Sequence, residues 1–334
     1  MGKVTIEHIS RLTGLSRGTI SRALNDRSDI NQKTKQRVLD ACVEVNYVPS
    51  HAARSLATGR NYSIALFVDS FCSAFSASVL RGAASPAFEA DYVLHPLELG
   101  STAETAVSRL KRFAADRIDA IISAVALDAG AAQVLREMTG QHPVVSCWPV
   151  KGLACDVLTP DHAEAGRMAA RHVLGSGVSD VVYLHADSDR AGEARRAGFQ
   201  EVCRERGLDA DAATHALVTG AGVGGVDWSS IRPLLERGAA VIAEDDFLAA
   251  SALVASAECG RLAGRDIAIM GLGNEPFGER IRPSLSTVDL GGEEIGRRAV
   301  ETVLARIAKK RMDRPQTVHI PPRLLIREST QSLN

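Results

Sequence analysis

Two arginines near the N-terminus, Arg17 and Arg22, stand among small residues that include Ser16, Gly18 and Ser21. Arginine can donate two parallel hydrogen bonds to the edge of a guanine, and hydroxyl and backbone N–H groups near a helix start can bind phosphate. An arginine pair alone is more often an ordinary basic surface than a binding site. The elements that position the pair therefore decide its interpretation.

The spacing of apolar residues predicts three short helices around this pair, at residues 5–12, 17–25 and 32–45. Gly14 permits a tight turn between the first two, and Ser16 can cap the second. The expected core residues are Ile6, Ile9, Leu12, Leu15, Ile20, Ala23, Leu24, Val38, Leu39, Cys42 and Val45. The sequence therefore predicts a helix-turn-helix whose second helix presents its exposed side to the major groove of DNA.

Charge is distributed unevenly along the 334 residues, whose overall net charge is -1. Residues 1–60 contain ten Lys and Arg against five Asp and Glu, whereas the remainder contains 29 against 35. A basic front on an acidic body is typical of a nucleic-acid-binding head joined to a domain with another task.

The composition indicates a folded chain, with 45% hydrophobic residues and no uninterrupted apolar stretch that could span a membrane. The six cysteines have no C-x-x-C spacing, and the N-terminus has no apolar signal-peptide segment. We therefore expect a cytoplasmic, nucleoid-associated protein with no metal site and no cofactor.

Beyond residue 62, apolar strand-like runs alternate with amphipathic helical stretches. The expected strands are 64–68, 118–125, 144–147, 181–184, 239–243 and 267–270, and the expected helices include 102–115, 161–174, 191–206 and 247–259. This alternation is typical of doubly wound parallel sheets, and its length indicates two lobes. The predicted fold class is α/β, with ligands expected beyond the carboxyl ends of the strands.

Several segments of the chain resemble the LacI (lactose repressor) family. In the head and hinge these are VTI at 4–6, GLS at 14–16, TISRALN at 19–25, KQRV at 35–38, NYVP at 46–49 and ARSL at 53–56. In the body they are RRAGF at 195–199, PSLSTV at 283–288 and PRLLIRES at 322–329. The resemblance covers nearly the whole chain and implies a transcription repressor with a periplasmic-binding-protein-like body.

The resemblance also implies domain boundaries and DNA contacts. The head spans 1–48, the hinge 49–61, and the body 62–334, with an N-lobe at about 62–160 and 289–320 and a C-lobe at about 161–288 and 321–330. Bases are contacted at Arg17, Gly18 and Arg22, and the remaining expected DNA contacts are Thr5, Ser16, Thr19, Ser21, Asn25, Thr34, Tyr47, Ala53 and Leu56.

The hinge at 49–57 is too short to form a stable helix by itself, so we expect it to form when two copies dock side by side on an operator. Leu56 is then the apolar wedge that enters the minor groove. The alternative is a flexible linker whose Leu56 packs on the body. The first interpretation predicts a homodimer on a pseudo-palindromic operator.

The effector site implied by the resemblance lies between the lobes. Its expected residues are Asp69, Phe75, Arg195, Trp228 and Asp246, with Trp148 and Asn274 from neighbouring loops. Carboxylates and a guanidinium can bind polyol hydroxyls, and aromatic faces can cover a sugar ring. The alternatives are that Asp246 caps a helix, that Arg195 pairs with Glu201, and that Trp228 belongs to the core.

The expected effector is a sugar or sugar derivative, with a nucleoside or purine corepressor as the alternative. The chain departs from the family's usual pattern at Ser73, His162, Asp245 and Gly273, which weakens the case for an ordinary hexose. Asp245 favours a hydroxyl-rich or cationic ligand, whereas the arginines at 190, 195 and 196 favour an anion. Whether the ligand releases the operator or tightens binding stays open.

Two motifs suggest enzymes, but neither has the required context. The glycine-rich segment at 220–225 has the G-x-G-x-x-G spacing of dinucleotide sites, but it stands late in the chain. The G-x-S-x-G pattern at 14–18 lacks the strand that precedes a nucleophile elbow. A secreted solute-binding protein would share the two lobes but not the basic head. We therefore predict a regulator that is not an enzyme.

Overall fold

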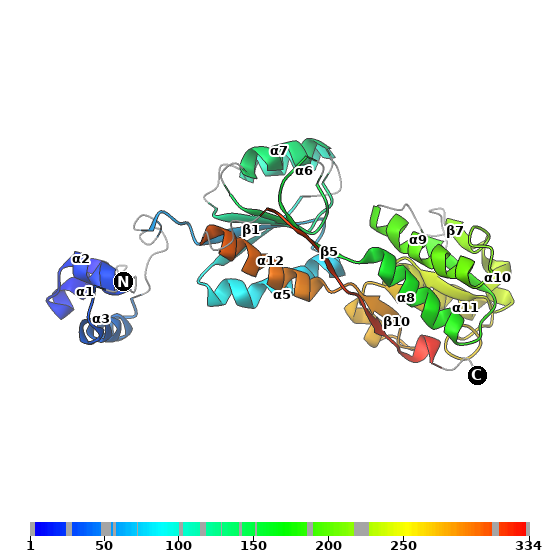
Figure 1. Ribbon diagram of the computed structural model, residues 1–334. Coiled ribbons are helices and arrows are strands. Elements are labelled where there is room, and N and C mark those ends of the chain that lie inside the picture. The colour runs from blue at the N-terminus through cyan, green and yellow to red at the C-terminus, as the bar shows by residue number, and fades with distance from the viewer. Residues whose placement is uncertain are drawn as a thin grey trace. The chain divides into compact units, whose positions relative to one another are not determined.

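The computed structural model describes residues 4–24, 29–47, 55, 58–71, 73–99, 103–113, 118–127, 129–139, 142–150, 152–185, 190–216, 227–308 and 314–331. The chain divides into two compact units (Figure 1). One consists of Met1–Ser63 with Arg117–Asp119, and the other of Ile64–Asp116 with Ala120–Asn334. The first contains the head and the second contains the body.

The head contains the three predicted helices, α1 (Ile6–Thr13), α2 (Arg17–Leu24) and α3 (Gln32–Glu44). Its buried apolar residues are Ile9, Ile20, Ala23, Val38, Ala41 and Cys42. Two predicted core residues are wrong, because Leu12 is 50% exposed and Leu39 is 38% exposed. Three short helices enclose only one narrow face of each helix, so apolar residues one helical step away from that face stay in solvent.

Local hydrogen bonds fix where the head helices begin. The hydroxyl of Ser16 accepts a hydrogen bond from the backbone N–H of Thr19 at 3.1 Å, and Asn31 caps α3 by accepting from the N–H of Thr34 at 2.7 Å. Gly14 ends α1 in the left-handed region, with φ at 66°. The predicted cap at Ser16 and turn at Gly14 are therefore confirmed.

The body contains two six-stranded sheets, and the first has the strand order β11-β5-β4-β3-β1-β2. Its strands are β1 (Ser63–Val68), β2 (Val93–Glu98), β3 (Ala120–Ser123), β4 (Val144–Ser146), β5 (Asp156–Pro160) and β11 (Thr317–Ile320). The paired registers of β1, β3, β4, β5 and β11 are parallel. The helices that follow these strands are α5 (Ala74–Glu89), α6 (Ala103–Phe113) and α7 (Ala129–Thr139).

The second sheet has the order β12-β10-β9-β8-β6-β7, and its edge strand β12 runs antiparallel to β10. Its strands are β6 (Val181–His185), β7 (Thr214–Ala216), β8 (Ala240–Ala243), β9 (Ile269–Leu272), β10 (Ser286–Asp289) and β12 (Arg323–Leu325). The other helical elements are α8 (His162–Gly175), α9 (Arg190–Glu205), α10 (Arg232–Glu236), α11 (Asp246–Glu258), α12 (Gly292–Ile307), η2 (Pro276–Glu279) and η3 (Glu328–Thr330).

Successive residues of the second sheet belong to different apolar clusters. Val181 and Tyr183 pack with Phe199 of α9, whereas Val182 and Leu184 pack in a separate cluster that includes residues of α10 and α11. Because successive side chains of a strand point to opposite faces, helices cover both faces of this sheet. The predicted doubly wound α/β fold class is therefore confirmed.

Both lobes are assembled from separate chain segments, because the chain passes from one sheet to the other at three places (Figure 1). These places are between β5 and α8, between β10 and α12, and between β11 and β12. Each connection occurs directly after a strand, so residues near 160, 290 and 321 lie at the border of both lobes.

Glycines allow two helix pairs to approach closely. A Cβ atom at Gly166 of α8 would lie 1.9 Å from the carbonyl oxygen of Arg195, and one at Gly198 of α9 would lie 2.0 Å from that of Ala163. The pair α5 and α12 has the same arrangement, because a Cβ at Gly296 would lie 2.0 Å from the carbonyl oxygen of Val79. Backbone packs directly on backbone at these places, so alanine does not fit.

We therefore predict that Gly166→Ala destabilises the body by roughly 1–3 kcal/mol or more, because the added methyl group forces α8 and α9 apart. Gly175→Ala is the matched control in the same helix, since a Cβ there meets nothing within 4 Å. It is expected to be neutral or stabilising by up to about 1 kcal/mol. Urea unfolding followed by tryptophan fluorescence measures both, and equal stabilities would contradict the close approach.

Candidate functional site

The exposed side of α2 presents the two predicted base-contacting arginines. Arg17 forms an ion pair with Glu7, and Arg22 lies 3.3 Å from a carboxylate oxygen of Asp29. The side chains of Arg17 and Arg22 are 65% and 52% exposed. Exposed ion pairs contribute little free energy, so both guanidinium groups can exchange their carboxylate for a nucleic-acid partner. Gly18 between them is exposed.

The other predicted DNA contacts lie around the same surface or stabilise it. The hydroxyls of Ser16 and Thr19 lie 2.9 Å apart at the start of α2. Ser21 and Thr34 are half-buried, Thr5 is exposed before α1, and Tyr47 packs against the head core. The remaining three predicted contacts, Asn25, Ala53 and Leu56, lie outside the described residues.

One basic side chain of the head has a structural partner that the sequence analysis missed. The Nη2 atom of Arg37 in α3 donates a hydrogen bond to the carbonyl oxygen of Thr13 at 2.7 Å. Thr13 ends α1, where carbonyl groups lack partners within the helix. Arg37 therefore ties α3 to the end of α1.

A cavity of about 940 Å³ lies in the body. It is lined by residues that follow strands of the first sheet, by the first residues of α8 and α9, and by His319 of β11. The lining residues are Ala126, Leu127, Ala129, Ala132, Arg136, Trp148, Pro149, Gly152, Thr159, Pro160, Asp161, His162, Ala163, Ala191, Ala194 and His319. Its position beyond the carboxyl ends of strands agrees with the usual ligand site of such sheets.

Aromatic rings from both lobes meet at the wall of this cavity. Trp148 follows β4 and stacks on His162 at the start of α8, with ring centroids 5.0 Å apart and planes 8° apart. Phe75 of α5 lies on Trp148 with a centroid distance of 6.2 Å and an angle of 55°. Two predicted effector residues, Phe75 and Trp148, are thus brought together, and His162 joins them.

Arg195 of α9 lies behind this wall. Its Nη1 atom lies 3.4 Å from Nδ1 of His162. Burial raises the pKa of the Tyr183 hydroxyl, and the charge of the nearby Arg195 opposes that increase. The alternative partner, Glu201, instead binds Arg167 at 2.9 Å. Arg195 therefore supports the cavity wall through His162.

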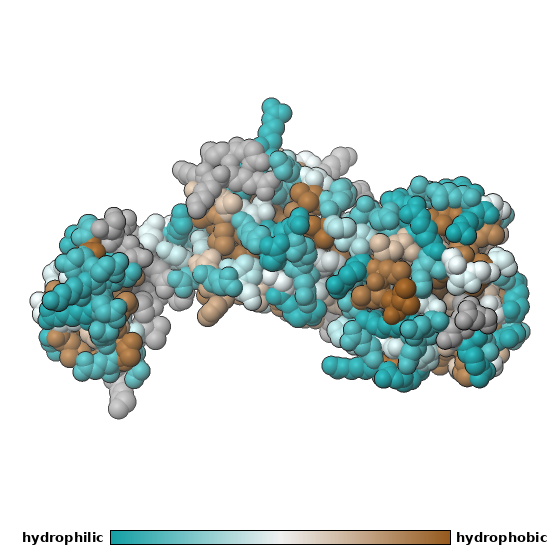
Figure 2. Space-filling model, turned by 60° about the horizontal axis from the view of Figure 1, so that its bottom comes forward, coloured by the Kyte–Doolittle hydropathy of each residue, from teal (hydrophilic) through white to brown (hydrophobic). Residues whose placement is uncertain are grey.

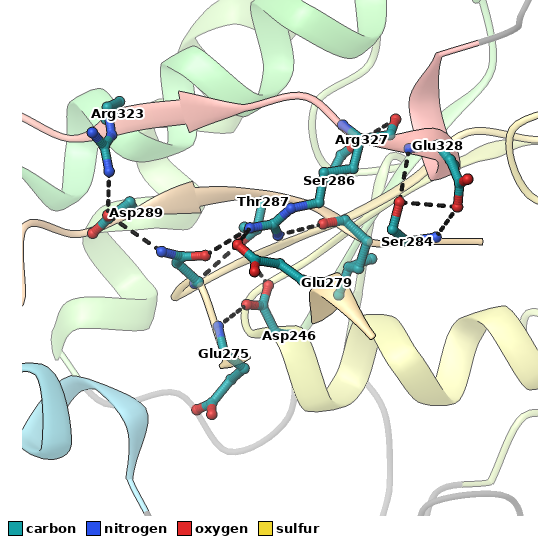
Figure 3. A network of polar contacts seen from close by, with 12 residues as sticks. Asp246, Glu275, Glu279, Ser284, Ser286, Thr287, Asp289, Arg323, Arg327 and Glu328 are labelled. Carbon is teal, nitrogen blue, oxygen red and sulfur yellow. Dashed lines mark hydrogen bonds and ion pairs between the residues drawn. The ribbon is translucent and has the colours of Figure 1, made fainter. Parts of the chain in front are cut away.

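Asp246 is buried in a network of polar contacts at the end of β9 and β10 (Figure 3). One carboxylate oxygen accepts from the hydroxyl of Thr287 and the other from the backbone N–H of Glu275, both at 2.6 Å. The helix cap is the neighbouring Asp245, which accepts from the N–H of Leu248 at 2.7 Å. Burial raises the pKa of Asp246 to about 6.

Asn274 belongs to the same network. Its amide nitrogen donates to Asp289 at 3.3 Å, and its oxygen accepts from Arg327 at 3.0 Å. Arg327 also binds Glu279 at 2.8 Å. The sequence pattern did not predict Arg327 as the centre of this network, although an arginine that follows an apolar strand near residue 325 could have indicated it.

Glu275 connects the two lobes, which the sequence analysis also missed. Its side-chain oxygen accepts a hydrogen bond from the backbone N–H of Ala74, the first residue of α5, at 3.2 Å. A carboxylate at a helix N-terminus is favoured by the helix dipole. The contact links the network around Asp246 to the lobe that contains Phe75.

The last two predicted effector residues have other surroundings. Asp69 is exposed and accepts from the N–H of Ser70 at 2.7 Å and from the hydroxyl of Ser76 at 2.5 Å. Trp228 is 8% exposed and packs in the apolar cluster with Ile231 and Leu235. Neither side chain lines the cavity.

Comparisons with known proteins agree with this two-part organisation. Residues 5–50 match the model for bacterial regulatory proteins of the lacI family, and residues 170–330 match the periplasmic binding protein-like domain. The chain is 25% identical to the transcriptional repressor PurR of Vibrio campbellii, over 99% of both chains. The Lac repressor dimer bound to operator and the anti-inducer ONPF has a TM-score of 0.78 at 20% identity, over 99% of this chain and 100% of that chain. The complex of the regulator CelR with cellobiose has a TM-score of 0.70 at 22% identity, over 98% of this chain and 100% of that chain.

The helix-turn-helix head and the two-lobed body define a DNA-binding transcription regulator that contains an effector domain. The chain belongs to the LacI family of bacterial regulatory proteins. Its relatives are transcriptional regulators, which are not enzymes. Within the described part of the chain no helix is long and apolar enough to cross a membrane, and no group of side chains could hold a metal ion.

The raised pKa of Asp246 predicts a pH-dependent stability. The protonated form is favoured in the folded state, so its stabilising contribution is complete below about pH 4 and is lost as the pH rises through about 6. Relative to Asp246→Asn, which does not titrate, the wild type should lose roughly 1–3 kcal/mol over this range. Urea unfolding at a series of pH values measures the difference. A difference that does not change with pH would contradict the assignment.

Proposed function

We propose that this regulator is a repressor that binds a pseudo-palindromic operator as a homodimer. A small molecule bound between its two lobes changes its affinity for the operator. The observation that carries the DNA-binding part is the exposed face of α2, where the side chains of Arg17 and Arg22 flank the exposed Gly18 on a helix fixed by the Ser16 cap and a buried core. This arrangement fits insertion into a major groove.

Within this proposal Arg17 and Arg22 contact base edges, and the exposed backbone at Gly18 lets the helix approach the groove closely. Ser16, Thr19, Ser21 and the other predicted polar residues bind phosphates, which positions the helix without specifying sequence. Ala53 and Leu56 of the hinge complete the contacts through the minor groove, as the sequence predicts.

A second copy of the chain is needed because one head buries too little surface for specific binding. An apolar surface suitable for pairing lies on α11, whose residues are apolar except for Asp246, Ser251, Ser256 and Glu258. Phe247 and Val254 on this helix are 57% and 48% exposed, and the ring of Phe247 packs on that of Phe277 at 5.0 Å. Figure 2 shows a brown apolar patch on the same lobe. Such a patch favours a dimer through the C-terminal lobe.

The regulator has no catalytic role in this proposal and acts in the cytoplasm on the nucleoid, where an operator is available. The cavity at Trp148 and His162 is the proposed effector site. Because residues of both lobes line it, a ligand that prefers one arrangement of the lobes shifts the population of that arrangement. Transmission of this shift to two paired hinges changes operator affinity.

We predict that Arg22→Ala lowers affinity for the specific operator by about 1–3 kcal/mol per half-site, because a base contact is lost. Binding to unrelated duplex at low salt should change much less. Thermal stability should be unchanged, since Arg22 is exposed and outside the head core. Fluorescence anisotropy with operator and unrelated duplexes measures both affinities. Arg265→Ala, at an exposed arginine of the body, is the control.

We further predict that Phe247→Asp produces monomers with weakened operator binding, because a charge is placed in the apolar surface that pairs the bodies. Leu262→Asp is the control, since Leu262 is 47% exposed on the same lobe but outside α11. Sedimentation equilibrium measures the assembly state. A Phe247→Asp protein that remains dimeric would exclude α11 as the pairing surface.

A further inference from the structure

The cavity is poorly suited to a neutral sugar. A sugar presents hydroxyl groups around its whole ring, and these require several polar partners. Eleven of the sixteen lining residues are Ala, Leu, Pro, Gly or Trp. The carboxylates expected to bind hydroxyls, Asp69 and Asp246, are not among the residues that line the cavity.

The wall of the cavity contains a guanidinium group that can bind an anion. Arg136, His162 and His319 line it, and the one acid among the described lining residues is Asp161. Asp161 is engaged as the cap of α8, where it accepts from the N–H of Glu164 at 2.9 Å. The carboxylate is thus held at the start of its helix, and the guanidinium of Arg136 is the charged group of the described wall that is suited to bind a negative ligand.

Three helix N-termini also meet this cavity. It is lined by Ala129 at the start of α7, by His162 at the start of α8, and by Ala191 in the first turn of α9. The positive ends of the three helix dipoles therefore lie at its wall, and they add to the charge of Arg136. This convergence follows from the fold, because each of these helices begins beyond the carboxyl end of a strand.

The cavity also offers a flat apolar surface. The stacked rings of Trp148 and His162 lie at its wall, and Phe75, which does not line the cavity, lies beside Trp148. A planar ring can add to such a stack by offset stacking, which contributes about 0.5–1.5 kcal/mol beyond the area buried. The volume of about 940 Å³ is large enough for a ring with substituents.

We propose that the effector is an anion with a planar apolar body, such as an aromatic carboxylate or an aryl phosphate, rather than a neutral sugar. This inference rests on the proposed function, because it names the ligand class of the proposed effector site. The ring packs against Trp148, and the anionic group is held by Arg136 and the helix N-termini.

The test uses the full-length protein and two measurements, thermal shift and tryptophan fluorescence. The probes are 4-hydroxybenzoate, indole-3-acetate and phenyl phosphate, the neutral counterparts 4-hydroxybenzamide and indole-3-acetamide, and the sugars cellobiose and ribose. At least one anion should raise the Tm and bind about tenfold or more tightly than its neutral counterpart. A response to phenyl phosphate alone supports the inference with phosphate as the anionic group.

Matched variants show whether the signal comes from this cavity. Arg136→Gln should weaken binding of the anion about tenfold or more, while Arg232→Gln, at an exposed arginine of α10, should leave it unchanged. The ligand-induced fluorescence change should disappear in Trp148→Phe, which leaves Trp228 as reporter of folding. Equal binding to wild type and Arg136→Gln would contradict the proposed anion site.

Different outcomes of this experiment overturn the proposed ligand class and the proposed function. Stabilisation by cellobiose or ribose with a Trp148 response, or no response to any anionic probe, overturns the anionic class and leaves DNA binding untouched. Absence of DNA binding at low salt, with and without every probe, overturns the proposed repressor whatever the probes do in the thermal shift.

Discussion

The direct contact between the backbones of α8 and α9 is the constraint on which the candidate effector site depends. Gly166 and Gly198 each lie against a carbonyl group of the opposite helix, so no side chain separates the two. His162 comes from one helix and Arg195 from the other, and their side chains meet only because the helices approach so closely. The two glycines thus set the place of the His162 ring that stacks on Trp148.

The same constraint occurs in the other lobe, where Gly292 and Gly296 of α12 lie against α5. Phe75 belongs to the first turn of α5, so the aromatic rings around Trp148 are positioned by one close helix pair in each lobe. A change in the relative position of the lobes therefore moves whole helix pairs and not single side chains. Such movement of rigid helix pairs lets a ligand bound between the lobes act on distant parts of a regulator.

The head is stabilised in a different way from the body. Its core is small, so its helices depend on caps at Ser16 and Asn31 and on the hydrogen bond from Arg37 to the end of α1. The arginines of its exposed face form only surface ion pairs, which exchange readily for phosphate or base contacts. Stability and recognition are therefore carried by different residues of the same helices.

The sequence by itself determined the helix-turn-helix, the α/β class and those helices and strands whose apolar pattern is strongest, because these follow from local periodicity, caps and glycine turns. It could not determine which of Asp245 and Asp246 caps α11, or that Leu12 and Leu39 are exposed, because burial depends on the neighbouring helices. Trp228 and Trp148 are chemically alike, yet one lies in the core and the other at the cavity. The meeting of Arg136, Trp148 and three helix N-termini at one cavity likewise emerges only in the tertiary structure, because these groups come from distant segments.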